Sequence, residues 1–193
     1  MQIIVTVFID KLYKILIEGR HLVELYEQKD PGFIPSFRDW LIKAESLLEE
    51  NRRPEVSEIA GIRAQLISAS HGAFDKTVFY FPAKLSQKKI YRAICGMLFN
   101  NAQHVLNNVY KIYSNYRDEA QKLIRQMLMY ALQKNVFYPV WNSTTSHSEK
   151  LNRLWQSFVN DPDLAQGTRQ ILSNVNYVDA LRIIDEAVSE WKL

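Results

Sequence analysis

Residues 89–111 read KIYRAICGMLFNNAQHVLNNVYK, and this stretch decides the fold class. At about 100° per residue its apolar side chains fall on one side of a helix, and a polar arc lies opposite. An amphipathic helix is therefore expected at the centre of the chain. The apolar side carries Tyr91, Ile94, Leu98, Val105, Val109 and Ile112, and the polar arc carries Lys89, Ala93, Gly96, Asn100, His104, Asn107 and Lys111.

The same three- and four-residue spacing of apolar side chains continues outward in both directions. Ser36, Ser146 and Asn176 are each followed three residues later by Asp or Glu, the arrangement of helix N-caps. We therefore predict an all-α, single-domain bundle of seven or eight helices. The expected helices cover about 2–28, 36–53, 54–71, 86–113, 115–134 with a new start or kink at Asn115, 146–160, 161–172 and 176–191.

Two aromatic stretches interrupt the helical pattern. Residues 74–84, FDKTVFYFPAK, lack helical spacing and contain Pro82, which predicts a long loop or a short strand. Residues 135–141, NVFYPVW, echo them and are expected to form a second loop. One alternative is a strand pair made by the two stretches, and another is a strand in the β-branched first nine residues. The predicted domain is 1–193, with the alternative sub-units 1–73 and 86–193 joined by the loop 74–85.

Composition excludes several classes of protein. With 193 residues, 47% hydrophobic, 23% charged and only six Gly and six Pro, the chain is neither disordered nor collagen-like. The single cysteine, Cys95, has apolar neighbours and is expected to be a buried, reduced thiol, which is typical of a cytoplasmic protein. The apolar N-terminus lacks basic residues and is interrupted at Asp10, so we expect neither a signal peptide nor a membrane span.

Charge is distributed unevenly, although the formal net charge is only +3. Residues 1–75 hold nine basic and twelve acidic residues, residues 76–134 hold ten and two, and residues 135–193 hold five and seven. The centre therefore carries +8 between segments of −3 and −2. Such a concentration of charge favours an anionic partner. The acidic cluster of the last helix is interpreted as a solvated face, and the alternative is that it docks onto this centre, within one molecule or between two: Asp185, Glu186 and Glu190.

Known catalytic patterns are absent from the sequence. There is no G-x-G-x-x-G, Walker A loop, G-x-S-x-G, H-E-x-x-H or C-x-x-C. Glu18 and His21 have the i, i+3 spacing of a di-iron ligand pair, but the sequence contains no second Glu-x-x-His. We therefore expect no metal, no cofactor and no enzymatic activity. A metal-independent nuclease site around His104 is kept as a third hypothesis.

Basic and aromatic residues are interleaved between Lys76 and Arg92, and cations with rings suit the phosphates and bases of a single strand. Four Asn residues then occur within nine positions of one helix. Because Asn is a poor helix former, we interpret this arc as a contact face; the alternative is a solvated face or an amide network that buries Asn101. The candidate binding residues are Lys76, Phe79, Tyr80, Lys84, Lys88, Lys89, Arg92, Asn100, His104, Asn107 and Lys111.

The first functional hypothesis is thus a non-enzymatic helical protein that binds nucleic-acid backbone, or a nucleoprotein assembly, through its basic centre. The alternative is an interaction adaptor or regulator that docks an acidic protein surface or self-associates as a homo-oligomer. Neither hypothesis requires a membrane or a metal ion. The two differ in the partner that the basic centre meets.

Overall fold

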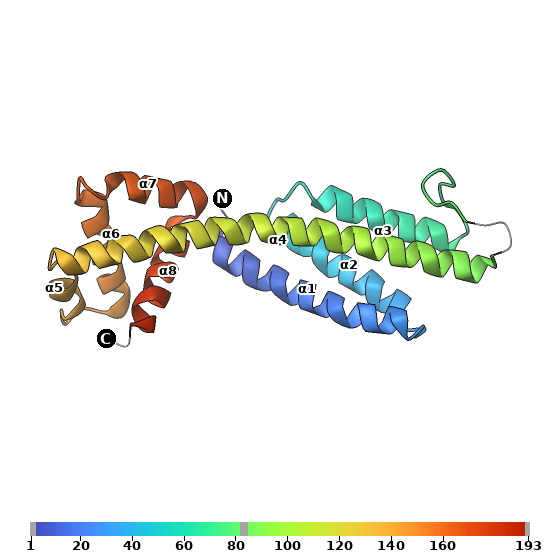
Figure 1. Cartoon of the computed structure of the whole chain (residues 1–193), viewed down its shortest axis with the longest axis horizontal. Coiled ribbons are helices and arrows are strands. Elements are labelled where there is room, and N and C mark those ends of the chain that lie inside the picture. The colour runs from blue at the N-terminus through green and yellow to red at the C-terminus, as the bar shows by residue number, and fades with distance from the viewer. Residues whose placement is uncertain (1–2, 82–84, 192–193) are drawn as a thin grey trace. The chain divides into compact units, whose positions relative to one another are not determined.

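The computed structural model describes residues 3–81 and 85–191, and within them the chain forms eight helices and no strand (Figure 1). The predicted all-α class is therefore confirmed, and the alternative strands are not formed in the described residues. The helices are α1 (Val5–Glu27), α2 (Phe33–Glu50), α3 (Val56–Ser70), α4 (Gln87–Gln133), α5 (Phe137–Trp141), α6 (His147–Asn160), α7 (Ala165–Asn174) and α8 (Tyr177–Glu190).

Contacts between residues divide the chain into two compact units. The four-helix unit is Phe8–Lys111, and the C-terminal unit comprises the described residues of 1–7 and 112–193. This division falls within α1 and α4, whereas the sequence-based sub-units meet at the loop 74–85. That residues 1–193 fold as one domain stays a prediction.

Aromatic side chains fill the core of the four-helix unit, in which α1, α2, α3 and the first half of α4 run alongside one another (Figure 1). The ring of Phe99 in α4 lies with its centroid 5.4 Å from Phe37 and 5.5 Å from Trp40, both in α2. Trp40 donates its Nε1–H to the carbonyl oxygen of Ile15 in α1 over 2.7 Å. The one polar group of this buried indole is therefore satisfied, and three helices share the core.

α1 and α4 approach each other closely at Gly96. A Cβ atom at this position would lie 2.5 to 2.9 Å from atoms of the Tyr26 side chain, whereas contacting carbon atoms are normally about 3.5 to 4 Å apart. The Tyr26 ring contacts the edge of Phe33 at 5.1 Å and lies under the Arg92 guanidinium at 5.2 Å. Only glycine fits here without displacing a ring that is held on two sides.

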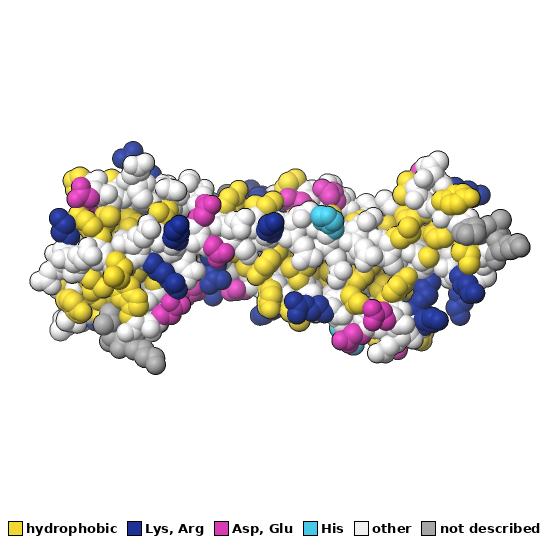
Figure 2. Space-filling view, viewed as in Figure 1, with side chains coloured by type: hydrophobic (Ala, Val, Ile, Leu, Met, Phe, Trp, Pro, Cys, Tyr) yellow, Lys and Arg dark blue, Asp and Glu magenta, His cyan; other side chains and the backbone are white. Residues whose placement is uncertain are grey.

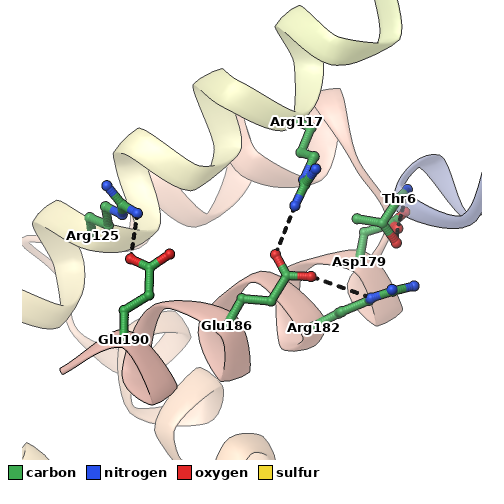
Figure 3. A network of polar contacts seen from close by, with 7 residues as sticks. All are labelled: Thr6, Arg117, Arg125, Asp179, Arg182, Glu186 and Glu190. Carbon is green, nitrogen blue, oxygen red and sulfur yellow. Dashed lines mark hydrogen bonds and ion pairs between the residues drawn. The ribbon is translucent and has the colours of Figure 1, made fainter. Parts of the chain in front are cut away.

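The C-terminal unit is organised around the fully buried carboxylate of Asp179 (Figure 3). One oxygen accepts the Thr6 N–H at 2.9 Å and the Thr6 hydroxyl at 2.7 Å, and the other accepts the Val5 N–H at 2.8 Å. Asn176 and Asp179 also form the predicted capping box of α8. A single carboxylate therefore caps the N-termini of α1 and α8, where its negative charge meets the positive ends of both helices.

Two predicted helix starts have different outcomes. Ser146 is the N-cap of α6, and its Oγ accepts the Glu149 N–H over 3.3 Å, as predicted. Ser36 is not an N-cap, because α2 already begins at Phe33 with Gly32 as its cap residue. Phe33 is fully buried and packs with the aromatic core, and Pro35 occupies the first turn, where no backbone donor is needed. Burial of the Phe33 ring thus favours a start of α2 about one turn before Ser36.

The predicted break at Asn115 is wrong, because α4 is one continuous helix of 47 residues. The residues there have local capping character, but buried side chains continue the apolar spacing beyond them, with Ala120 and Ile124 fully buried in the C-terminal unit. Tertiary packing on both sides of Asn115 therefore overrides a weak local stop signal. α4 ends instead at Gln133, and the turn that follows it contains Asn135, which has a positive φ of 54°.

The two aromatic stretches form no strand pair in the described residues, and the prediction of a loop over 135–141 is wrong for most of that stretch. Residues 137–141 form the short helix α5, because Phe137 and Trp141 are four positions apart and their rings stack at 5.5 Å when this segment is helical. The described part of the first stretch, up to Phe81, consists of turns, as the loop prediction required. Pro82, Ala83 and Lys84 lie outside the described residues.

Across residues 3–81 and 85–191, none of the helices is both long enough and apolar enough to cross a membrane.

Replacing Gly96 by Ala is expected to destabilise the protein, whereas the same change at Gly61 is expected to stabilise it. The new methyl group at position 96 overlaps Tyr26, which predicts a loss of about 1 to 3 kcal/mol. A Cβ at Gly61 in α3 meets nothing within 4 Å, so its higher helix propensity predicts a gain of about 0.5 to 1 kcal/mol. Urea unfolding followed by circular dichroism measures both, and equal effects of the two changes would contradict the close approach at Gly96.

Replacing Asp179 by Asn is expected to destabilise the C-terminal unit. Both carboxylate oxygens accept buried N–H groups, so whichever side the amide turns, its NH₂ faces a donor. A buried donor left unpaired costs about 1 to 3 kcal/mol, and the lost charge adds to this cost. Asp185→Asn, which removes a partly exposed carboxylate from the same helix, is the control and should cost under about 1 kcal/mol. Thermal and urea unfolding of the two variants distinguish the sites.

Candidate anion-binding site

The C-terminal part of the basic segment 76–134 is paired with acidic residues of its own chain. Arg117 in α4 contacts Glu186 in α8 at 2.9 Å, and Arg125 contacts Glu190 at 2.6 Å (Figure 3). The acidic last helix is therefore not simply a solvated face: the alternative of intramolecular docking is the one that these ion pairs support. These two arginines are therefore already occupied, and the positive charge available to a partner must come from elsewhere in the segment.

Three lysines near the start of α4 remain available. Lys76 lies in the loop before α4, and Lys88 and Lys89 lie in its first turn; all three are exposed. None of them forms an ion pair with a carboxylate in the described parts of the chain. Figure 2 shows Lys and Arg side chains next to hydrophobic ones around the start of α4. We call Lys76, Lys88 and Lys89 the lysine cluster.

A groove of about 540 Å³ lies beside this cluster, which we call the α3–α4 groove. Its volume is within the range of about 300 to 1,000 Å³ that is usual for ligand sites. The end of α3, the loop after it and the first turns of α4 form its walls. Two lysines, two aromatic rings and two uncharged polar side chains are among its lining residues: Lys76, Lys88, Phe74, Tyr91, Ser70 and Gln87.

The loop that carries Lys76 is held by local hydrogen bonds. The Thr77 hydroxyl and N–H donate to the Asp75 carboxylate at 2.7 and 2.8 Å, and these bonds hold the pKa of Asp75 below its ordinary value. Phe79 is only 6% exposed, and its N–H donates to the carbonyl oxygen of Asp75. Phe79 therefore anchors the loop and presents almost no surface for stacking, whereas Tyr80 beside it is 86% exposed.

Arg92 is used by the fold. Its Nη2 donates to the carbonyl oxygen of Tyr26 over 2.5 Å, and its guanidinium lies over the Tyr26 ring. Tyr26 belongs to the last turn of α1, where carbonyl groups lack helical partners and a cation is favourable. The structure thus gives this candidate binding residue contacts at the end of α1 that hold its guanidinium in place, although a neutral carbonyl group and a ring leave its positive charge uncompensated.

The polar arc of α4 is exposed at Asn100, His104, Asn107 and Lys111, but its groups are mostly engaged within their own helix. The Asn107 amide donates to the Gln103 carbonyl oxygen at 2.8 Å, and the Asn108 amide lies 2.9 Å from Nδ1 of His104. Asn101 is exposed, so the alternative of a buried amide network is wrong at that residue.

Helix geometry also separates the later part of this arc from the lysine cluster, although Lys89 belongs to both. At about 1.5 Å per residue, His104 lies about 24 Å along the axis from Lys88, and Lys111 lies about 35 Å from it. The site therefore brings together Lys76 and Lys88, which line one groove, with Lys89 next to Lys88 in the chain and Tyr80 four residues after Lys76, and it leaves the Asn and His side chains apart. Lys84 cannot be placed in it, because it lies outside the described residues.

The Glu18 and His21 pair has other partners. Lys43 contacts Glu18 at 2.8 Å, and His21 contacts Glu24 at 3.2 Å. Within residues 3–81 and 85–191, no three side chains of His, Cys, Asp or Glu lie close enough to hold a metal ion. A salt bridge of Glu18 and a hydrogen bond between His21 and Glu24 account for both residues of the candidate motif.

Sequence reasoning missed several residues of the α3–α4 groove. Ser70 and Gln87 stand at a helix end and a helix start, where polar residues are ordinary and give no functional signal. Arg38 of α2 lies close enough to Tyr91 for its charge to favour the ionised phenol, although burial dominates and raises the pKa of Tyr91 to about 12. Nothing in the sequence places residue 38 near residue 91.

Cys95 is a buried thiol, as predicted. Burial is the main reason that its pKa is raised to about 11, with partial compensation by a hydrogen bond from Tyr91. The thiol is therefore protonated at neutral pH. It lacks the thiolate character and the exposure that a reactive cysteine needs.

Comparison with known proteins found no matching family profile, no similar curated protein and no similar solved structure. The function is therefore inferred from the side chains themselves.

The Cys95 thiol is expected to resist labelling in the folded protein. At pH 8 a thiol of pKa about 11 has a thiolate fraction at least about 100-fold below that of an ordinary cysteine of pKa about 8.5. Reaction with a chromogenic disulfide reagent should accordingly be at least about 100-fold slower before unfolding in urea than after it. Rapid labelling of the native protein would contradict the burial of this side chain.

Proposed function

We propose that the protein binds nucleic acid through the lysine cluster, without catalysing a reaction on it. The observation that carries this proposal is the contrast within one basic segment: Arg117 and Arg125 are paired with acidic side chains, whereas Lys76, Lys88 and Lys89 are not paired with any described carboxylate. Free cations that face solvent attract the phosphate backbone, and counterion release makes such binding favourable.

The surroundings of the cluster support the same partner. Tyr80 is almost fully exposed, and Phe74 and Tyr91 line the adjoining α3–α4 groove, so aromatic surface lies within the basic region. Bases stack on such rings independently of sequence. No histidine or carboxylate is among the described residues that line the groove, so it lacks the side chains that most often act as general acids and bases. Binding without catalysis is the function that this set of groups suits best.

Charge reversal at Lys88 and Lys89 is expected to weaken binding at least about tenfold. We expect wild-type protein to bind a labelled oligothymidine of about 12 nucleotides at low salt, with a log–log salt slope near about −2 for three phosphate contacts. Each lysine lost from a phosphate contact should reduce this slope by about one unit or less. Fluorescence anisotropy at several salt concentrations measures the affinity and the slope together.

Lys111→Glu with Lys122→Glu is the matched control, because it makes the same change in net charge on exposed lysines of the same helix. This control should reduce binding less than the Lys88 and Lys89 pair does. Equal losses in both double variants would contradict a localised site. No binding to DNA or RNA at low salt would remove the proposal and leave an acidic protein as the partner to test for the same lysines.

A further inference from the structure

Among the described residues, three grooves can be compared around the aromatic loop of the four-helix unit, and their described linings differ in charge. One, between α1 and α4, includes Glu27, and another, against α3, includes Asp75. The α3–α4 groove has no carboxylate in its lining and has Lys76 and Lys88 instead. Of these three grooves, it is the one whose charge is complementary to an anionic ligand.

The α3–α4 groove also has the surfaces that a nucleobase requires. Phe74, Ile90 and Tyr91 provide apolar and aromatic surface, and Ser70 and Gln87 provide uncharged hydrogen-bonding groups. A nucleobase has an apolar face and a polar edge, and proteins recognise unpaired bases by stacking and by hydrogen bonds to that edge. The Tyr91 phenol, whose pKa burial raises to about 12, is neutral at physiological pH, as an ordinary tyrosine is, and does not repel phosphate.

We propose that the α3–α4 groove takes an unpaired base of a single strand, while Lys76 and Lys88 meet the phosphates on either side of it. This inference rests on the proposed function and makes it more specific. Bases inside a duplex have both faces covered by their neighbours, so a concave site can accept only a base outside the stack. The lysine cluster alone attracts any polyanion. The groove makes the protein prefer single strands.

Blocking the groove without changing charge tests this inference. Ser70 is an exposed residue at the end of α3 and lines the groove, so Ser70→Trp places an indole in the space meant for the base. Gln65→Trp is the matched control, because Gln65 is also exposed on α3 but lines the groove that contains Asp75. Circular dichroism establishes that both variants keep the helicity of the wild type.

The single-stranded probes are oligothymidine and oligouridine of about 12 nucleotides, and an abasic oligonucleotide that keeps the phosphates and lacks the bases. The double-stranded probe is the oligothymidine paired with oligodeoxyadenosine. Stacking of one base contributes about 1 to 3 kcal/mol, which is about 5- to 150-fold in affinity. Wild-type protein and Gln65→Trp should therefore bind the thymidine strand at least about fivefold more tightly than the abasic strand. Ser70→Trp should bind both equally, with the salt slope unchanged.

The outcomes separate the two proposals. Equal wild-type affinity for the thymidine and abasic strands, with binding still lost on charge reversal at Lys88 and Lys89, would overturn the groove and leave backbone binding intact. A loss of base preference in Gln65→Trp as large as in Ser70→Trp would also overturn it. Absence of binding to every probe would overturn both proposals. Tighter binding of oligouridine than oligothymidine would support the groove and identify RNA as the ligand.

Discussion

Helix ends leave backbone groups without partners, and the structure depends on supplying those partners from distant parts of the chain. The N–H groups of Val5 and Thr6 at the start of α1 donate to Asp179, which is 173 to 174 residues away. The carbonyl group of Tyr26 near its end accepts from Arg92, 66 residues away. Because partners in α4 and α8 satisfy the two ends of this first helix, part of its stability comes from the tertiary fold.

This constraint also decides which charges remain for function. The Asp179 carboxylate and the Arg92 guanidinium bind backbone groups at the ends of α1. Arg117 and Arg125 form ion pairs with carboxylates of α8. What remains near the start of α4 is a small group of lysines beside aromatic side chains and a groove without carboxylates. The proposed binding region is therefore much smaller than the segment 76–134 with its net charge of +8. The sequence shows that a basic side chain is present, but its contacts in the fold determine whether its charge is already paired.

The helices were largely predictable because their apolar side chains repeat with helical spacing, and the capping pairs at Ser146 and Asn176 were read correctly. Local signals failed where packing overrides them, as at Asn115 inside α4 and at Ser36, three residues after the true start of α2. Among the residues of the candidate site, the lysines could be predicted from the concentration of positive charge in the sequence. The sequence could not predict that Phe79 is buried, that Arg92 binds the end of α1 or that Ser70 lines the groove. Each of these depends on how elements that are separate in the sequence pack against one another.

The most direct measurement of the central claim is the location of bound nucleic acid on the chain. A single strand that carries a photoactivatable thymidine analogue can be cross-linked to the protein and the attached peptide identified by mass spectrometry. Base contact in the α3–α4 groove predicts cross-links within residues 70–91, at side chains such as Phe74, Tyr80 and Tyr91. Cross-links confined to the Asn-rich arc at 100–111, or to the C-terminal unit, would contradict the account.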